Sequence, residues 1–166
     1  MTKFAIRSPK VLLDGEMKAA TVVIENGKIL EILPFDAKLG ESIETKDLGT
    51  LNLLPGLVDT HVHINEPGRT EWEGFNTATQ AAAAGGITTV VDMPLNCSPV
   101  TTTADALRQK LEALEGKLWI DCGFWGGVVP NNLDQLDELV QAGVLGVKSF
   151  TIHSGMMNSH RFTQST

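Results

Sequence analysis

After Pro55-Gly56 the chain alternates apolar, strand-like runs with helix-like segments, and this alternation constrains its fold more than any other feature. Strands that alternate with helices pair in parallel, either in an open sheet or in a closed barrel. A complete (β/α)₈ barrel needs eight strands and about 250 residues. The pattern therefore predicts a parallel sheet, either open or part of an incomplete barrel, with strands at 57–64, 88–93, 118–125 and 144–150 and helices at 70–84, 103–115 and 132–142.

Local signals mark the ends of these predicted helices. Thr70 and Glu73 have the spacing of a capping box at the start of the first helix, and Gly85-Gly86 follows its last residue. The second helix carries leucines on one face and is followed by Gly116. The third has a similar apolar stripe and is followed by Gly143.

The first 54 residues predict a small sheet module. Two strand-like runs, 20–25 and 28–33, flank Asn26-Gly27, a dipeptide typical of tight hairpins. Two shorter strands are expected at 4–6 and 11–13, around a turn that contains a proline. The division predicted is thus a β module at 1–54, four β/α units at 55–150 and a polar tail at 151–166.

Composition excludes several classes of protein. Residues 51–166 hold six basic and twelve acidic side chains, which argues against binding nucleic acid phosphates. No apolar run approaches the roughly 20 residues that span a bilayer, and the N-terminus lacks the apolar stretch of a secretory signal. The two cysteines do not form a disulfide framework, so we expect a cytoplasmic protein.

The sharpest chemical signal is the segment Asp59-Thr60-His61-Val62-His63. Side chains two apart on a strand share a face, so His61 and His63 point the same way, with Asp59 one step earlier. Two imidazoles at the C-terminal end of the first barrel strand suit a divalent metal ion. The alternative is that both histidines are polar strand residues facing solvent.

Lys148 is the second signal, because it lies within an apolar, glycine-flanked strand. Burial favours the neutral amine of a lysine. A neutral amine can react with carbon dioxide to give a carbamate, whose two oxygens could bridge two metal ions. A lysine that extends its ammonium to the surface is the alternative, and the upstream His-x-His pair favours the metal role.

In combination these motifs resemble the cyclic amidohydrolases, which include dihydroorotases, hydantoinases, dihydropyrimidinases and allantoinases. The resemblance runs from about Phe4 to Gly155. It rests on the segments 54–63, 66–68, 86–94 and 146–148.

The resemblance implies a small β-sandwich module at 1–54, followed by the first half of a metal-dependent hydrolase TIM barrel with two zinc ions. His61 and His63 would bind one ion, and carboxylated Lys148 would bridge both. Asp59 and Asp92 would orient the ligands, although plain hydrogen bonding at strand ends explains them equally well. Two further histidines and a general-base aspartate would lie downstream, so this chain alone is expected to be inactive. The intact enzyme is expected to be a homotetramer.

The loop at 63–75 resembles that of allantoinases most closely. Dihydroorotases carry an arginine where this chain has Asn65, and that cation holds a substrate carboxylate that allantoin lacks. The segment 93–99 is also allantoinase-like. Asn65 and Asn96 are therefore candidate contacts to a small-molecule substrate, allantoin, although Asn65 could equally cap the loop. A different cyclic amidohydrolase and a non-catalytic assembly module are the remaining alternatives.

Overall fold

The computed structural model describes residues 3–151 of the chain. Apart from Thr151, the predicted polar tail at 151–166 lies outside these residues. The chain divides into two compact units, Met1–Pro55 and Gly56–Thr166, and each is described separately. No helix within residues 3–151 is both long enough and apolar enough to cross a bilayer.

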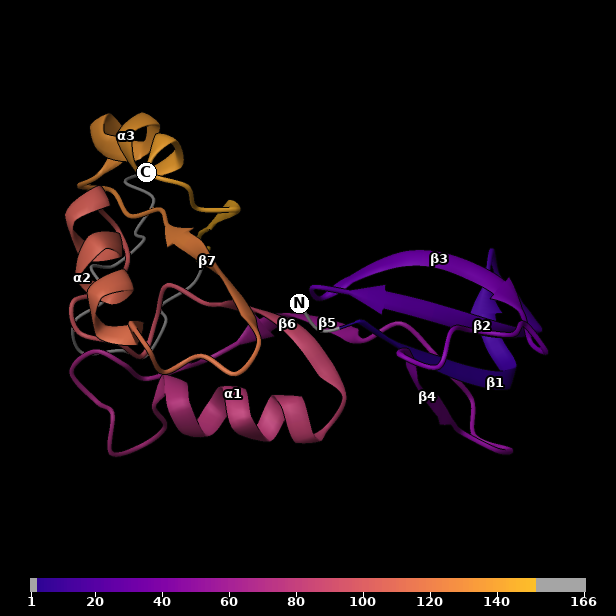
Figure 1. The fold of residues 1–166 in the computed structure, drawn as a ribbon. Helices are drawn as coiled ribbons and strands as arrows, with labels where there is room; N and C mark the ends of the chain where they lie inside the picture. Colours follow the sequence, from indigo (N-terminus) through magenta and orange to yellow (C-terminus); the bar gives the residue numbers. More distant parts are fainter. Residues whose placement is uncertain (1–2, 152–166) are drawn as a thin grey trace. The chain divides into compact units, whose positions relative to one another are not determined.

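The first unit is a four-stranded sheet with the strand order β3-β2-β1-β4 (Figure 1). β1 pairs antiparallel with β2 and parallel with β4, and β2 pairs antiparallel with β3. Val11, Ala20 and Val22 form its buried apolar cluster. Among the described residues this unit holds one sheet and no second sandwich layer. Its strands are β1 (Lys3–Leu13), β2 (Glu16–Glu25), β3 (Lys28–Pro34) and β4 (Glu44–Asp47).

The hairpin predicted at Asn26-Gly27 is confirmed, with φ angles of 52° and 77°. Asp14-Gly15 makes an equivalent turn between β1 and β2, with φ angles of 51° and 81°. The prediction of two short strands around a proline turn was wrong. β1 is continuous, and its pairing shifts register between Ser8 and Val11, so Pro9 lies in a bulge where it need not donate to the ladder.

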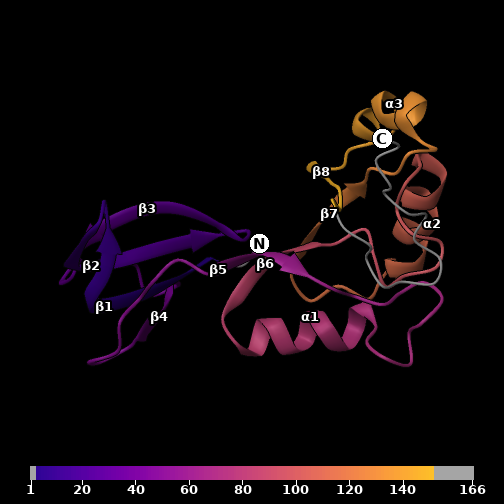
Figure 2. The same cartoon turned by 180° about the vertical axis from the view of Figure 1, so that it is seen from behind.

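The second unit confirms the predicted half-barrel fold class. Its four strands are parallel in the order β5-β6-β7-β8, and the helices α1, α2 and α3 follow one another around the outside of the strands (Figure 2). The strands are β5 (Leu57–Val62), β6 (Ile87–Asp92), β7 (Asp121–Gly127) and β8 (Gly146–Lys148). The helices are α1 (Phe75–Ala84), α2 (Ala104–Leu114) and α3 (Leu136–Gln141), the last preceded by a 3₁₀ turn, η1 (Leu133–Gln135).

Aromatic packing joins the helices to the strands. The rings of Phe75 and Phe124 meet edge to face, with centroids 6.2 Å apart and an interplanar angle of 78°. Fully burying a large apolar side chain stabilises a fold by about 1.5–3 kcal/mol. The core cluster consists of Ile64, Phe75, Leu107, Phe124, Leu139 and Val144.

Helix α1 begins at Phe75, so the prediction of a helix from Thr70 with a Thr70–Glu73 capping box was wrong. The backbone N–H of Asn65 donates to the carbonyl of Glu73 at 2.9 Å and closes the intervening segment into a loop. The buried carboxylate of Glu66 then accepts the Phe75 N–H at 2.9 Å and takes the place of the absent cap. The side chain of Glu66, nine residues before Phe75, thus determines where the helix begins.

The third strand begins three residues later than predicted, at Asp121. The indole of Trp119 donates to Asn76 at 2.8 Å, and its backbone N–H donates to Thr79 at 3.2 Å. These bonds attach the preceding residues to α1 instead of to a neighbouring strand. The third predicted helix is shortened by the 3₁₀ turn η1, while the predicted α2 is confirmed, with Thr103 as its N-cap.

Candidate metal-binding site

The carboxyl end of β5 carries His61 and, one residue beyond the strand, His63. Their ring centroids are 5.5 Å apart and the rings are tilted by 50°. Both side chains are exposed. The strand alternation predicted from the sequence therefore brings the two imidazoles together.

Lys148, at the end of β8, reaches the same place. Its Nζ lies 3.5 Å from Nε2 of His61 and 3.4 Å from Sδ of Met93. It also lies 5.0 Å from the centre of the Phe150 ring. Within residues 3–151 no carboxylate forms an ion pair with Lys148.

This environment lowers the pKa of His63 below its usual 6.5. Partial burial of the His63 ring is the largest cause, because it disfavours the charged form of the imidazole. The positive charges of Lys148, His61 and Lys110 act in the same direction. The neutral imidazole is the form that donates a lone pair to a metal ion, so the site favours the binding-competent state.

The donor set fits part of a metal centre. No group of three or more His, Cys, Asp or Glu side chains gathers for a metal ion in the described part of the chain. Two imidazoles and one lysine converge instead, and zinc usually takes four ligands. A carboxylated Lys148 would add oxygen donors to the two nitrogen donors.

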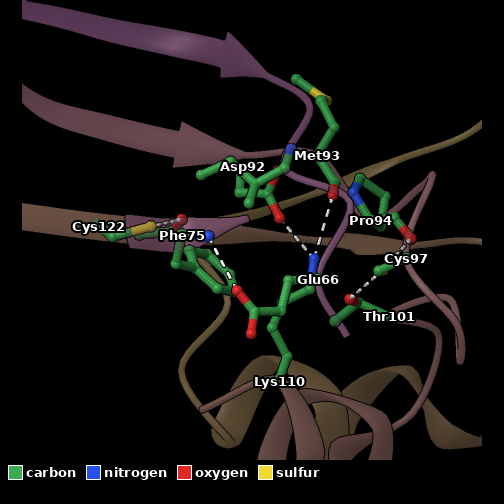
Figure 3. A network of polar contacts seen from close by, with 11 residues as sticks. Glu66, Phe75, Asp92, Met93, Pro94, Cys97, Thr101, Lys110 and Cys122 are labelled. Atoms are coloured by element: carbon green, nitrogen blue, oxygen red, sulfur yellow. Dashed lines mark hydrogen bonds and ion pairs between the residues drawn. The ribbon is translucent and has the colours of Figure 1, made fainter. Parts of the chain in front are cut away.

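Asp92 lies beneath this site and is fully buried. One carboxylate oxygen accepts the backbone N–H of Ile64 at 2.7 Å, and the other accepts a bond from Lys110 Nζ at 2.5 Å (Figure 3). Burial raises the pKa of Asp92, while Lys110 and the hydrogen bonds oppose that shift. Asp92 thus holds the backbone immediately after His63.

Asp59 makes a local contact. Its Oδ1 accepts the backbone N–H of His61 at 3.0 Å. This is hydrogen bonding at a strand end, and it also fixes the backbone that carries a candidate ligand. Both explanations offered for Asp59 are compatible with this contact.

Asn65 and Asn96 lie in the loops after β5 and β6. Within the described residues, no side-chain hydrogen bond joins either of them to His61, His63 or Lys148. Asn65 is 8% exposed, and its Oδ1 is buried with no hydrogen-bond partner. Asn96 has a φ angle of 67°, a left-handed conformation that asparagine tolerates better than most residues. Backbone geometry alone therefore accounts for asparagine at position 96.

Sequence reasoning missed Lys110, which is 1% exposed. The signal was present, because Lys110 lies three residues after Leu107 and four before Leu114, on the apolar stripe of α2. A lysine on such a stripe needs a buried partner. Its partner is Asp92, for which the sequence predicts either orientation of the metal ligands or hydrogen bonding at a strand end.

The Cys122 thiol keeps its proton at neutral pH. Cys97 and Cys122 are free thiols, and Cys97 is buried. Burial raises the pKa of Cys122 to about 12, with a further contribution from the Asp92 charge. A thiol that keeps its proton is a poor metal ligand and a poor nucleophile.

Comparison with known proteins gives consistent matches. Residues 52–165 match the model of the Amidohydrolase family. An allantoinase of Saccharomyces cerevisiae is 53% identical over 161 residues, covering 92% of this chain and 35% of that protein. An allantoinase of Streptomyces avermitilis is 52% identical over 154 residues, covering 93% and 35%. The chain thus spans about a third of the length of these curated relatives.

A solved structure shares the fold. The L-hydantoinase (dihydropyrimidinase) from Arthrobacter aurescens superposes with a TM-score of 0.85 at 29% sequence identity. The match covers 97% of this chain and 35% of that one. The half-barrel and the small sheet together therefore correspond to about a third of a hydantoinase chain.

Proposed function

Because the chain belongs to the amidohydrolase family, we propose that it is part of an allantoinase-like enzyme that hydrolyses allantoin to allantoate. The convergence of His61, His63 and Lys148 at the carboxyl ends of β5 and β8 carries this proposal. Catalytic groups of barrel enzymes gather at that end of the strands. The two allantoinases above, both more than 50% identical, support the choice of substrate.

In this proposal His61 and His63 would hold zinc through their ring nitrogens, and Lys148 would contribute oxygen donors as its carbamate. The carbamate forms when the neutral Nζ attacks carbon dioxide, with a new N–C bond and release of one proton to solvent. The observed surroundings favour the product, because the negative carbamate would lie beside the two imidazoles of His61 and His63. Bound zinc would supply Lewis-acid polarisation of the amide carbonyl that water attacks.

The other candidate residues orient the imidazoles or contact the substrate. Asp59 and Asp92 hold the backbone N–H groups of His61 and Ile64, and so keep the two imidazoles directed at one point. Asn65 has a buried Oδ1 without a partner, which an N–H group of a ring amide could satisfy. Asn96 is the second candidate contact to the substrate.

Further ligands and the general base are expected beyond these residues. Metal-dependent ring hydrolysis needs a water-activating base as well as Lewis-acid groups. The chain spans 35% of the relatives, so we expect negligible turnover from the 166-residue chain alone. Homotetramer formation, a cytoplasmic location and a role in purine breakdown belong to the same proposal for the intact enzyme. The free thiols are compatible with a reducing compartment.

A substrate panel tests the proposal. The intact protein and the 166-residue chain would each be supplied with zinc and assayed on allantoin, hydantoin, dihydrouracil and dihydroorotate. We expect allantoin to be preferred by the intact protein, with loss of turnover in Lys148→Met and unchanged turnover in Lys10→Met, a control in the other unit. Preference for hydantoin would support a second candidate function, that of a hydantoinase, which the structural match to L-hydantoinase favours. Zinc-dependent turnover by the short chain would contradict the expectation of inactivity.

A further inference from the structure

The backbone on both sides of His63 is held by Asp92, the last residue of β6, and by Met93, which follows it. The N–H of Met93 donates to the carbonyl of Val62 at 2.8 Å. The N–H of Ile64 donates to Asp92 Oδ1 at 2.7 Å. His63 lies between these two bonds, beyond the last residue of β5, where ladder pairing no longer fixes the chain.

Lys110 anchors both of the holding residues. Its Nζ donates to Asp92 Oδ2 at 2.5 Å and lies 3.4 Å from the carbonyl oxygen of Met93 (Figure 3). Its Nζ is also 5.8 Å from the centre of the Phe124 ring. Lys110 and Asp92 have side-chain exposures of 1% and 0%, so water does not compete for these bonds.

A buried ion pair is weak evidence of stabilisation, since removing two charges from water offsets much of their attraction. Apolar residues of similar volume often serve a core equally well. What apolar residues cannot supply is an acceptor for the Ile64 N–H at a fixed position. The pair is therefore better explained by what it holds than by its contribution to folding.

We infer that Lys110 is a positioning residue of the candidate metal site, acting through Asp92 to fix the backbone that carries His63. The consequence for metal binding rests on the proposed function, whereas the consequence for the Ile64 backbone does not. Loss of residues that hold metal ligands in place typically weakens metal affinity about 10–100-fold. Lys110 itself touches no candidate ligand.

Amide hydrogen exchange of Ile64, followed by NMR on the 166-residue chain, tests this inference directly. In Lys110→Met, we expect Ile64 to exchange at least about tenfold faster, after correction for any change in global stability. The matched control is Lys117→Met, which breaks another lysine–carboxylate pair in the same unit, with Glu66. Ile64 exchange should be unchanged in that control.

The double variant Asp92→Leu/Lys110→Met distinguishes an effect on the Ile64 backbone from an effect on global stability. It also replaces the single variant as the test if Lys110→Met does not fold. We expect it to be more stable than Lys110→Met, which leaves the Asp92 charge buried and unpaired, yet to show the same fast exchange at Ile64. Asp92→Asn/Lys110→Met keeps an acceptor oxygen and should restore part of the protection. Wild-type protection of Ile64 in either Lys110→Met or the Leu/Met variant would overturn the inference.

A Co²⁺ titration, read by its visible absorption, provides the link to the site. We expect weaker binding in Lys110→Met and in the Leu/Met variant, and wild-type binding in Lys117→Met. If the wild-type chain binds no Co²⁺ at all, the proposed metal site fails while Ile64 exchange still decides the positioning role. If it binds Co²⁺ and all variants bind equally, the positioning role is contradicted.

Discussion

The Nζ atom of Lys148 lies 3.5 Å from Nε2 of His61, although 87 positions separate the two residues in the chain. Their strands, β5 and β8, are the two outer strands of the four-stranded parallel sheet. Curvature of the sheet brings their carboxyl ends close enough for contact. A contact between two bases across a half-barrel contributes little to folding, which supports a role in binding.

The stability of the chain should depend on His63 in weakly acidic solution. The pKa of His63 is lowered in the folded state, so near pH 6.5 the unfolded chain binds more protons than the folded one. Stability should therefore be retained above about pH 6.5 and should fall as the pH decreases below it. Urea unfolding between pH 5 and pH 8 measures this. The fall should be shallower in His63→Gln, and equal slopes in both proteins would refute the prediction.

Cys122 should produce the opposite dependence in alkaline solution. Burial raises the pKa of its thiol from the ordinary 9.0 to about 12 in the folded chain. As the pH rises above about 9 the unfolded chain loses this proton first, so stability falls. The chain has no tyrosine to titrate in the same range. Urea unfolding at pH 8, 9 and 10 should show a steeper loss for wild type than for Cys122→Ala, and parallel curves would count against the assignment.

Glu66 should determine the start of α1. Glu66→Ala leaves the Phe75 N–H without its acceptor and Lys117 without its partner, and we expect a loss of about 1–2 kcal/mol. Glu66→Gln keeps a carbonyl oxygen and should lose less. The control is Glu71→Gln, an exposed position in the same loop. Equilibrium urea unfolding measures all three, and a neutral Glu66→Ala would show that the helix starts without this bond.

The aromatic core should be the most sensitive part of the second unit. Phe124→Ala removes the ring that meets Phe75 and Lys110, and we expect a loss of about 3–5 kcal/mol. Leu133→Ala, at a position that is 62% exposed, should change stability by no more than about 0.5 kcal/mol. Thermal and urea unfolding compare the two. Similar effects at both positions would contradict the assignment of the core.

Local chemistry explains which parts of the fold could be predicted. The Asn26-Gly27 hairpin and the helix predicted at 103–115 depend on residues a few positions apart, and both are confirmed. The start of α1 depends on Glu66, nine residues before the N–H that it accepts. The third strand begins at Asp121 instead of at Leu118, because Trp119 bonds to α1 across 40 and 43 positions. Such distant bonds leave no periodic pattern in the sequence.

In the candidate site, too, some features follow from local sequence patterns and others depend on contacts between distant residues. The period of a strand places His61 beside His63, and the order of parallel strands brings Lys148 to them. The pairing of Lys110 was not predicted from the sequence, because its partner Asp92 lies 18 residues away, on β6. That pairing follows from how α2 packs on the strands, which no short motif specifies. The metal, ligand-orienting and substrate roles of these residues remain predictions.

The central claim is that His61, His63 and Lys148 together hold divalent metal. Anomalous diffraction at the zinc absorption edge, from zinc-soaked crystals of the intact protein, tests it most directly. The account predicts strong peaks within coordination distance of both imidazoles and of a carboxylated Lys148. Well-ordered crystals in which these three side chains lie free while zinc binds elsewhere would contradict it.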